Sequence, residues 1–135
     1  MEGNFRALVR LEASVAPSED VGKVQMAVEN VIGDCARSIE KERTTVKISS
    51  SDIRCLARLH DQLRDRRIRA AARRLLTANR VGDATRVMLN RQAAFQGVVA
   101  LCGAAEESSL GPIYLQIESR ELGEVIEWLT AYSSG

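Results

Sequence analysis

Apolar and polar residues alternate along two stretches in the first third of the chain. In residues 5–15, FRALVRLEASV, every second side chain is apolar, and Leu8 is the one apolar residue on the opposite side. A period of two predicts a strand with one buried face, and burial on one side favours an antiparallel sheet. Residues 44–48 alternate in the same way, whereas the charged stretch 37–43 is compatible with a loop or with an exposed strand end.

Between these two strands the apolar residues recur every three or four positions, which predicts an amphipathic helix. Pro17 ends the preceding strand, Ser18 is the expected N-cap, and Gly33 ends the helix. The apolar stripe of this helix consists of Val21, Val24, Val28, Val31 and Ile32.

A long helical stretch, residues 52–79, changes the side on which its apolar residues lie. At about 100° per residue, its two apolar stripes would lie on nearly opposite sides of one continuous helix. A single straight helix cannot bury both against one sheet, so we expect a break near residues 64–67 and two helices. The stripes are Ile53, Leu56, Leu59 and Leu63, followed by Ile68, Ala72, Leu75 and Leu76.

The last third of the chain predicts three strands and a closing helix. Short apolar runs bounded by turn residues place the strands at 85–89, 96–102 and 113–118. Pro112 has no backbone donor, so it belongs at the first position of its strand or at a sheet edge. Ser119 is the expected cap of the helix. The buried stripe of that helix is Leu122, Val125, Ile126 and Leu129.

The predicted element order is β-α-β-α-α-β-β-β-α. Runs of strands without intervening helices indicate an α+β fold. We therefore expect a two-layer α+β domain, with a mostly antiparallel sheet of about five strands and helices on one face. Residues 1–135 are expected to form this single domain, because the chain is long enough to bury one core.

Composition argues against membrane and secreted proteins. No apolar run approaches about 18 residues, so no membrane span is predicted. Residues 1–5 lack a basic region followed by an apolar block, so no secretory signal is predicted. Cys35, Cys55 and Cys102 show no ligand-pair spacing, and we expect them to be unpaired thiols. The sequence therefore predicts a cytoplasmic protein without a metal site.

No catalytic constellation is visible along the chain. His60, the single histidine, lies beside the predicted leucine stripe and is expected at the edge of the core. Glu106 and Glu107 adjoin on a loop without metal-ligand companions, and no serine or cysteine has a nucleophile context. No glycine-rich phosphate loop follows a strand. We therefore expect a protein that is not an enzyme and has no cofactor.

Charge is distributed unevenly, although the total is only +1. Residues 52–91 contain eleven arginines and four aspartates, a net +7, whereas residues 92–135 carry a net −5. Such a layout produces a local field that the total charge hides.

The second half of the 52–79 stretch concentrates this positive charge. Arg66, Arg69 and Arg73 fall on the face away from the apolar stripe, with Arg67 and Arg74 beside them. Arginine forks suit phosphate oxygens, so we expect this face to contact a nucleic-acid backbone. Two alternatives stay open, namely a solvated helix face and a contact with the glutamates of the last helix in a second subunit.

Two motifs in the last third of the chain resemble those of a known family. They are LNRQAAFQG at residues 89–97 and LGPI at residues 110–113. As a pair they are similar to the motifs of a family of small, uncharacterised archaeal proteins that is grouped with RNA-binding proteins. That family has a fold like the ribosomal large-subunit protein that binds the small ribosomal RNA. PSED at 17–20 and EVIEWL at 124–129 extend the resemblance over nearly the whole chain.

The resemblance implies an RNA partner and a homodimer, and it implies no reaction. The sequence departs from the family pattern in having Arg91 where lysine is common and in having few aromatic residues on its strands. The second departure matters because base stacking needs aromatic rings.

The connection from Asn90 to Phe95 has two interpretations. It presents amide and guanidinium groups to phosphates or base edges, or it is a structural turn in which Asn90 bonds the backbone. The sequence leaves both open. The complete set of predicted RNA contacts is Arg66, Arg69, Arg73, Arg74, Arg86, Asn90, Arg91 and Gln92.

The face of the predicted sheet away from the helices is expected to carry Leu8, Val99, Leu101 and Tyr114. That set is too apolar for a solvated face, so we expect a dimer through this face or through a strand edge. Tyr114 is either a stacking surface for a base or a dimer contact. The alternative function is a protein-interaction or assembly module whose basic face binds an acidic protein.

Overall fold

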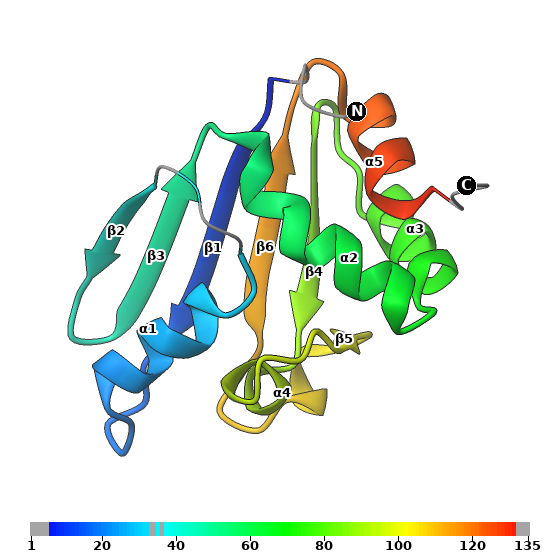
Figure 1. The fold of residues 1–135 in the computed structure, drawn as a ribbon. Coiled ribbons are helices and arrows are strands. Elements are labelled where there is room, and N and C mark those ends of the chain that lie inside the picture. The colour runs from blue at the N-terminus through cyan, green and yellow to red at the C-terminus, as the bar shows by residue number, and fades with distance from the viewer. Residues whose placement is uncertain (1–5, 33–34, 36, 132–135) are drawn as a thin grey trace.

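A six-stranded antiparallel sheet, in the order β2-β3-β1-β6-β4-β5, organises the fold in a computed structural model that describes residues 6–32, 35 and 37–131 (Figure 1). The strands are β1 (Leu8–Ser14), β2 (Ser38–Lys41), β3 (Thr45–Ser50), β4 (Ala84–Leu89), β5 (Leu101–Cys102) and β6 (Ile113–Glu118). The helices are α1 (Val21–Glu29), α2 (Ala57–Asp65), α3 (Arg69–Ala78), α4 (Arg91–Phe95) and α5 (Leu122–Thr130). The predicted α+β class is confirmed, with six strands in place of about five.

Alternation along the strands produces the two faces of the sheet. β1 pairs with β3 on one side and with β6 on the other, so that Leu11 lies opposite both Ile48 and Leu115. These three side chains are buried on the helix side. Arg10 and Glu12, which flank Leu11 in β1, are exposed on the open side. One face is therefore covered and the other faces solvent, as the period of two predicted.

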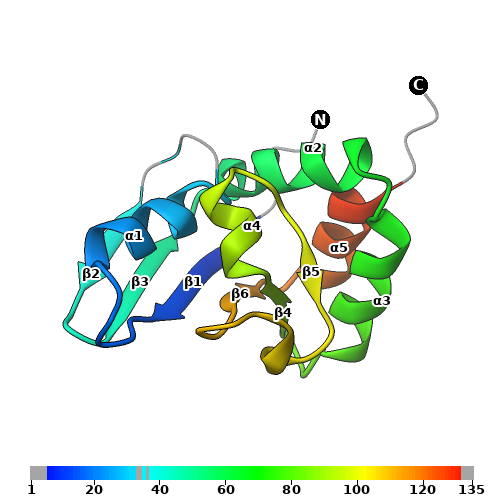
Figure 2. The same cartoon turned by 90° about the horizontal axis from the view of Figure 1, so that it is seen from below.

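α1, α2 and α5 lie on one side of the sheet, whereas α3 lies beside its β4 end (Figures 1 and 2). α1 packs on β1 and β3, α2 crosses in front of the sheet, and α5 packs against α2 and α3. The predicted break separates α2 from α3, and Arg67 takes a left-handed backbone there, with φ of +58°. The change in stripe phase thus located the break correctly.

Two predicted caps differ from the structure in detail. Asp20, and not Ser18, caps α1, because its Oδ1 accepts from the Gly22 amide at 2.8 Å. The N-cap position of α5 is Glu121, not the predicted Ser119. Ser119 Oγ instead accepts from the amide of Glu121, at 3.0 Å. Gly33, the predicted end of α1, lies outside the described residues.

The predicted strand at 96–102 is wrong for most of its length. Residues 91–95 form the short helix α4, Gly97 takes φ of +74°, and only Leu101–Cys102 pairs with β4. The helix is explained by Asn90, whose side-chain oxygen accepts from the Ala93 amide at 2.9 Å. The stretch at 37–43, which the sequence left undecided, contains the exposed edge strand β2.

The predicted apolar open face is also wrong. Val99 is buried in the core at 1% exposure, because α4 and the turn at Gly97 replace the strand that would have turned it outward. The open face carries charged and polar residues between half-buried Leu8 and Tyr114. The apolarity from which a dimer through this face was inferred is therefore absent.

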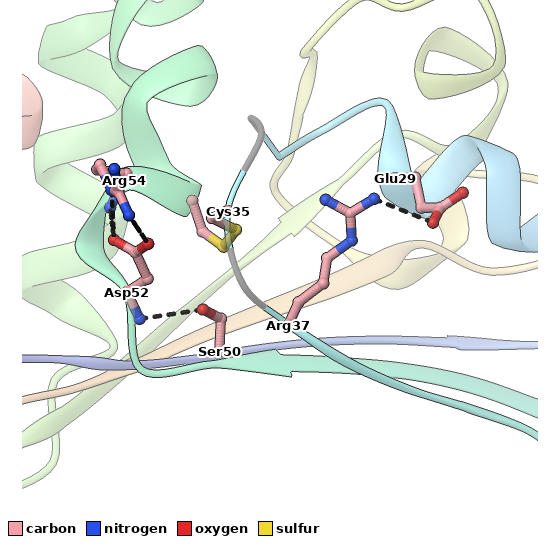
Figure 3. The surroundings of a disulfide bond; sticks show 7 residues. Glu29, Cys35, Arg37, Ser50, Asp52 and Arg54 are labelled. Atoms are coloured by element: carbon pink, nitrogen blue, oxygen red, sulfur yellow. Dashed lines mark hydrogen bonds and ion pairs between the residues drawn. A yellow bond between two sulfur atoms is a disulfide. The ribbon is translucent and has the colours of Figure 1, made fainter.

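The prediction of three unpaired thiols is wrong for two of them. Cys35 and Cys55, 20 residues apart, form a disulfide with their Cα atoms 5.4 Å apart (Figure 3). Cys35 follows α1 and Cys55 lies in the 3-10 turn Ile53–Leu56, so the disulfide closes a loop that contains the β2–β3 hairpin. Cys102 is free and buried, and burial raises the pKa of its thiol, with a further rise from Glu107.

Candidate nucleic-acid interface

Arg91, one of the predicted phosphate contacts, lies entirely inside the protein. Its Nη1 donates to both carboxylate oxygens of Glu19, at 2.7 and 2.9 Å, and its Nη2 donates to Ser14 Oγ at 3.4 Å. The two charged side chains are 0% and 8% exposed. A guanidinium with no exposed surface cannot contact a phosphate, so the predicted RNA contact of Arg91 is corrected to an internal ion pair.

The two motifs that carried the family resemblance meet at this ion pair. Ser108 Oγ accepts from the Arg91 amide at 3.1 Å and donates to the Gly111 carbonyl at 3.0 Å. Leu110 and Gly111 have φ of +69° and +92°, which form the tight turn before β6. The contacts therefore support the structural interpretation of this part of the chain.

The other two residues of the connection, Asn90 and Gln92, also have internal partners. Asn90 caps α4, and Gln92 accepts from Ser108 Oγ at 3.3 Å and donates to Ser109 Oγ. Gln92 is nevertheless exposed, so its amide borders solvent. The structure thus uses these side chains to join α4 to the loop before β6.

Three predicted arginines face other parts of the chain. Arg69 Nη1 donates to the Ala131 carbonyl at 2.8 Å, and Arg73 Nε donates to Thr130 Oγ1 at 3.0 Å. Both contacts lie at the carbonyl end of α5, where the helix dipole favours cations. Arg66 Nη1 donates to the Val99 carbonyl.

Arg73 also pairs with Glu127 of α5, with Nη2 and Oε2 3.1 Å apart. One contact between arginines of α3 and glutamates of α5, considered above for two subunits, thus forms within a single chain. The basic face that the sequence predicted is consequently divided, and its α5-facing part is occupied by internal contacts.

Three further exposed arginines of residues 52–91 have guanidinium groups with neither a hydrogen-bond nor an ion-pair partner among the described residues, and we call them the basic strip: Arg67, Arg74 and Arg86. All three are exposed, and among residues 6–32, 35 and 37–131 their guanidinium groups have no acidic partner within ion-pair distance. By contrast, Arg64 is hydrogen-bonded to Asp65 at 3.0 Å, and this bond and the charge of Asp65 raise the arginine pKa. The sequence prediction had not included Arg67 among the contacts.

One hollow at the β4 edge lies between Arg86 and the last turn of α3. Arg74 and Ala78 are one helical turn apart on α3, and Ala78 lines a hollow of about 470 Å³ together with Arg86. Asn79 Nδ2 donates to the Arg86 carbonyl at 2.9 Å, which satisfies part of the edge that β5 leaves unpaired. The three arginines therefore lie at the α2–α3 corner, on α3 and on the open face of β4.

Tyr114 lies where the basic strip reaches the open face. It is on β6, half-buried, and the guanidinium carbon of Arg86 is 5.6 Å from the centre of its ring. The strict alternation of β6 had predicted its outward direction. The guanidinium thus lies over one face of an aromatic ring that is partly open to solvent, in a cation–π contact.

The described residues offer no metal site and no candidate nucleophile with a base. No group of three histidine, cysteine, aspartate or glutamate side chains among them is placed to hold a metal. His60 stacks on Trp128 with ring centres 4.9 Å apart. None of the helices in the described part of the chain has the length and apolarity needed to cross a bilayer.

Comparisons with known proteins confirm the archaeal family. No family model matches the chain. A UPF0201 protein of Sulfurisphaera tokodaii is 38% identical over 123 residues, covering 89% of this chain and 84% of that protein. One from Aeropyrum pernix is 38% identical over 133 residues, covering 96% and 89%.

Solved structures agree with this assignment. The crystal structure of a UPF0201 protein from Methanococcus jannaschii is 25% identical, covers 95% of this chain and 96% of that one, and superposes with a TM-score of 0.78. RNA binding and a homodimer stay predictions after these comparisons. The chain belongs to the UPF0201 family of archaeal proteins.

Proposed function

We propose that this protein is a non-catalytic, cytoplasmic RNA-binding module that contacts phosphates through the basic strip. The observation that carries the proposal is that three exposed arginines, within a segment of net charge +7, have guanidinium groups with neither a hydrogen-bond nor an ion-pair partner among the described residues. Unpaired guanidinium groups bind phosphate oxygens through charge-assisted, often bidentate hydrogen bonds. The resemblance to a family grouped with RNA-binding proteins points in the same direction.

The backbone at Arg67 is a second reason to include this residue. A non-glycine residue in the left-handed region costs roughly 1–2 kcal/mol, and Arg67 holds φ of +58°. Strained positions of this kind cluster at functional sites. At the α2–α3 corner the conformation directs an arginine into solvent and away from the internal contacts of Arg66 and Arg69.

Contacts between arginine and phosphate increase the affinity for RNA without distinguishing one base from another. Each arginine–phosphate contact releases counterions, so the slope of log K against log salt steepens by about 0.7 to 0.9 for each contact. We assign the three arginines of the basic strip to phosphates, and contacts to phosphates carry no information about the base. We therefore expect binding that depends strongly on salt and weakly on the base sequence.

The double variant Arg67→Gln with Arg74→Gln is expected to weaken RNA binding about tenfold or more at low salt, because two phosphate contacts are lost. The salt slope should fall by about 1.4 to 1.8, twice the value for one contact. Fluorescence anisotropy with a labelled RNA hairpin and a labelled single strand, at several salt concentrations, measures both quantities.

The matched control removes two arginines that already have acidic partners. Arg54 and Arg64 are exposed but pair with Asp52 and Asp65, and replacing both by glutamine changes the net charge by the same amount. This control should alter the affinity much less. Undetectable binding by the unaltered protein, or equal losses in the two double variants, would contradict the proposal.

A second candidate function is assembly into a homodimer through β2. This edge strand pairs only with β3 in the described part of the sheet, its four residues are exposed, and Ile39 is 38% exposed. An unpaired strand edge is a template for pairing with a second chain. A dimer of this kind is compatible with the basic strip, which lies at the other end of the strand order.

Ile39→Lys is expected to shift a dimer toward monomer, because it places a charge in the new strand pair. Sedimentation velocity at micromolar concentration measures the change. Met26→Lys is the control, since Met26 is 53% exposed but lies on helix α1 and not in the strand that would pair. A strict monomer in the unaltered protein would exclude this candidate, and capture of an acidic protein in a nuclease-insensitive way would favour the interaction module over RNA.

A further inference from the structure

The open face of the sheet at Tyr114 has the features of a site for one flat aromatic ligand. A hollow of about 260 Å³ lies beside the ring, and its lining includes Arg10, Glu12, Lys47 and Gln116. This volume is below the roughly 300–1,000 Å³ of sites for drug-sized ligands. No helix covers this face (Figures 1 and 2). The hollow therefore suits one ring system and not a whole cofactor.

We propose that Tyr114 is a stacking site for an unpaired base of single-stranded RNA. This inference rests on the proposed RNA-binding function and adds the class of RNA that is bound. Stacking on an aromatic side chain needs a base that is free of its own helix, and every base has a face to offer. Gln116, two residues further along β6, points to the same face and offers both a donor and an acceptor to the edge of such a base.

The position of Arg86 connects this stacking site to the basic strip. Arg86 lies opposite Gln116 in the β4–β6 register, and Met88 lies opposite Tyr114. The guanidinium carbon of Arg86 lies over the ring, 5.6 Å from its centre, on the β4 side. The hollow lies on the β1 and β3 side of Tyr114, so a base would stack on the ring from that side. A phosphate at Arg86 would hold its nucleotide next to Tyr114.

The shape of the β4 edge favours a single strand over a duplex. β5 pairs only with Met88 and Leu89, so the first part of β4 is flanked by α3 and by the hollow between Ala78 and Arg86. A backbone that contacts Arg74 and then Arg86 must pass from the helix layer around this edge to the opposite face. A flexible single strand can follow that path, whereas a stiff duplex cannot bend so sharply.

The charges on the open face indicate where the nucleotide lies. Arg10 and Lys47 attract phosphates, but Glu12, the cross-strand neighbour of Tyr114, and Glu40 repel them. The backbone is therefore expected on the β4 side, at Arg86, with the base directed toward β6. A carboxylate beside the base accepts hydrogen bonds from amino groups and does not conflict with stacking.

The test compares Tyr114→Leu with Tyr114→Phe, which keeps the ring. Titrations use a labelled twelve-nucleotide single strand and the matching duplex. Tyr114→Leu should weaken single-strand binding roughly tenfold with an unchanged salt slope and should leave duplex binding as it was. Tyr114→Phe should stay within about twofold of the unaltered protein. Sedimentation velocity of each variant confirms that the oligomeric state is the same.

The variant Tyr114→Trp gives an independent readout. Its tryptophan fluorescence should fall on addition of the single strand, because a stacked base quenches an indole ring. The unaltered protein, whose single tryptophan is Trp128, supplies the background.

Three results would overturn the inference. They are unchanged single-strand affinity in Tyr114→Leu, no quenching in Tyr114→Trp, and an altered oligomeric state in Tyr114→Leu. If these occur while Arg67→Gln with Arg74→Gln still weakens binding, RNA binding by the strip stands and only the stacking site falls. Absence of binding by the unaltered protein removes both.

Discussion

Replacing Arg91 with alanine is expected to lower the free energy of unfolding by about 3–5 kcal/mol. The substitution leaves the Glu19 carboxylate, 8% exposed, without the two hydrogen bonds that it accepts from Arg91 at 2.7 and 2.9 Å. A buried charge without a partner is costly because the interior solvates it poorly. The hydrogen bond from the Ala16 amide to Glu19, at 2.9 Å, is too weak to compensate for the two lost bonds.

Urea unfolding followed by circular dichroism measures this effect. Arg54→Ala is the matched control, since Arg54 makes an ion pair with Asp52 at 2.8 Å but on the surface, and its unfolding midpoint should stay nearly the same. Replacing both Arg91 and Glu19 by methionine should cost much less than Arg91→Ala alone, because no charge is left unpaired. A loss below about 1 kcal/mol in Arg91→Ala would show that the pair is not buried in solution.

The Arg91 contact changes how the two sequence motifs are interpreted. Residues outside the motifs join them: Ser108 links the Arg91 amide to the Gly111 carbonyl, and Arg91 pairs with Glu19. Asn90 caps α4 within the first motif. The pair of motifs thus fixes the end of the molecule at which α4, the β6 turn and the segment before α1 meet. A motif shared within a family can therefore report on its fold, and the proposed binding surface lies elsewhere, on the basic strip.

The sheet and the helix break were accessible from the sequence because both depend on periodicity. Alternation defined β1, β3 and β6, and a change in the phase of the leucine stripe placed the break near Arg67. Periodicity gives no signal where an element spans little more than one repeat. α4 has five residues, little more than one turn, so its apolar residues showed no stripe, and the apolar run that follows it was taken for a strand.

The candidate site was only partly predictable for a different reason. A helical wheel shows which arginines point away from the apolar stripe, and Arg69 and Arg73 do so. It cannot show that the end of α5 lies there, since contacts from guanidinium groups to Ala131 and Thr130 leave no apolar signal in the sequence. The Arg91–Glu19 pair, 72 residues apart, has no local signature at all. Tyr114 was predictable, because strand alternation alone determines its face.

Removing the Cys35–Cys55 disulfide is expected to lower the free energy of unfolding by about 3 kcal/mol. The bond closes a loop of 20 residues that contains the β2–β3 hairpin, and opening it restores conformational entropy to the unfolded chain. The surroundings support an ordered site: Arg37 pairs with Glu29 at 3.3 Å on one side, and Asp52 and Arg54 pair at 2.8 Å on the other (Figure 3).

The measurement is urea unfolding of the oxidised protein with and without a thiol reductant, and of the double variant Cys35→Ala with Cys55→Ala. The reduced protein and the double variant should show similar losses, since both lack the cross-link. Adding reductant to the double variant should have no further effect, because Cys102 is unpaired and buried. Equal unfolding midpoints with and without reductant would mean that the two thiols are not bonded in the purified protein. Non-covalent contacts alone would then hold the β2–β3 hairpin against the 3-10 turn at Cys55. The edge strand β2 would be less constrained than in the cross-linked protein.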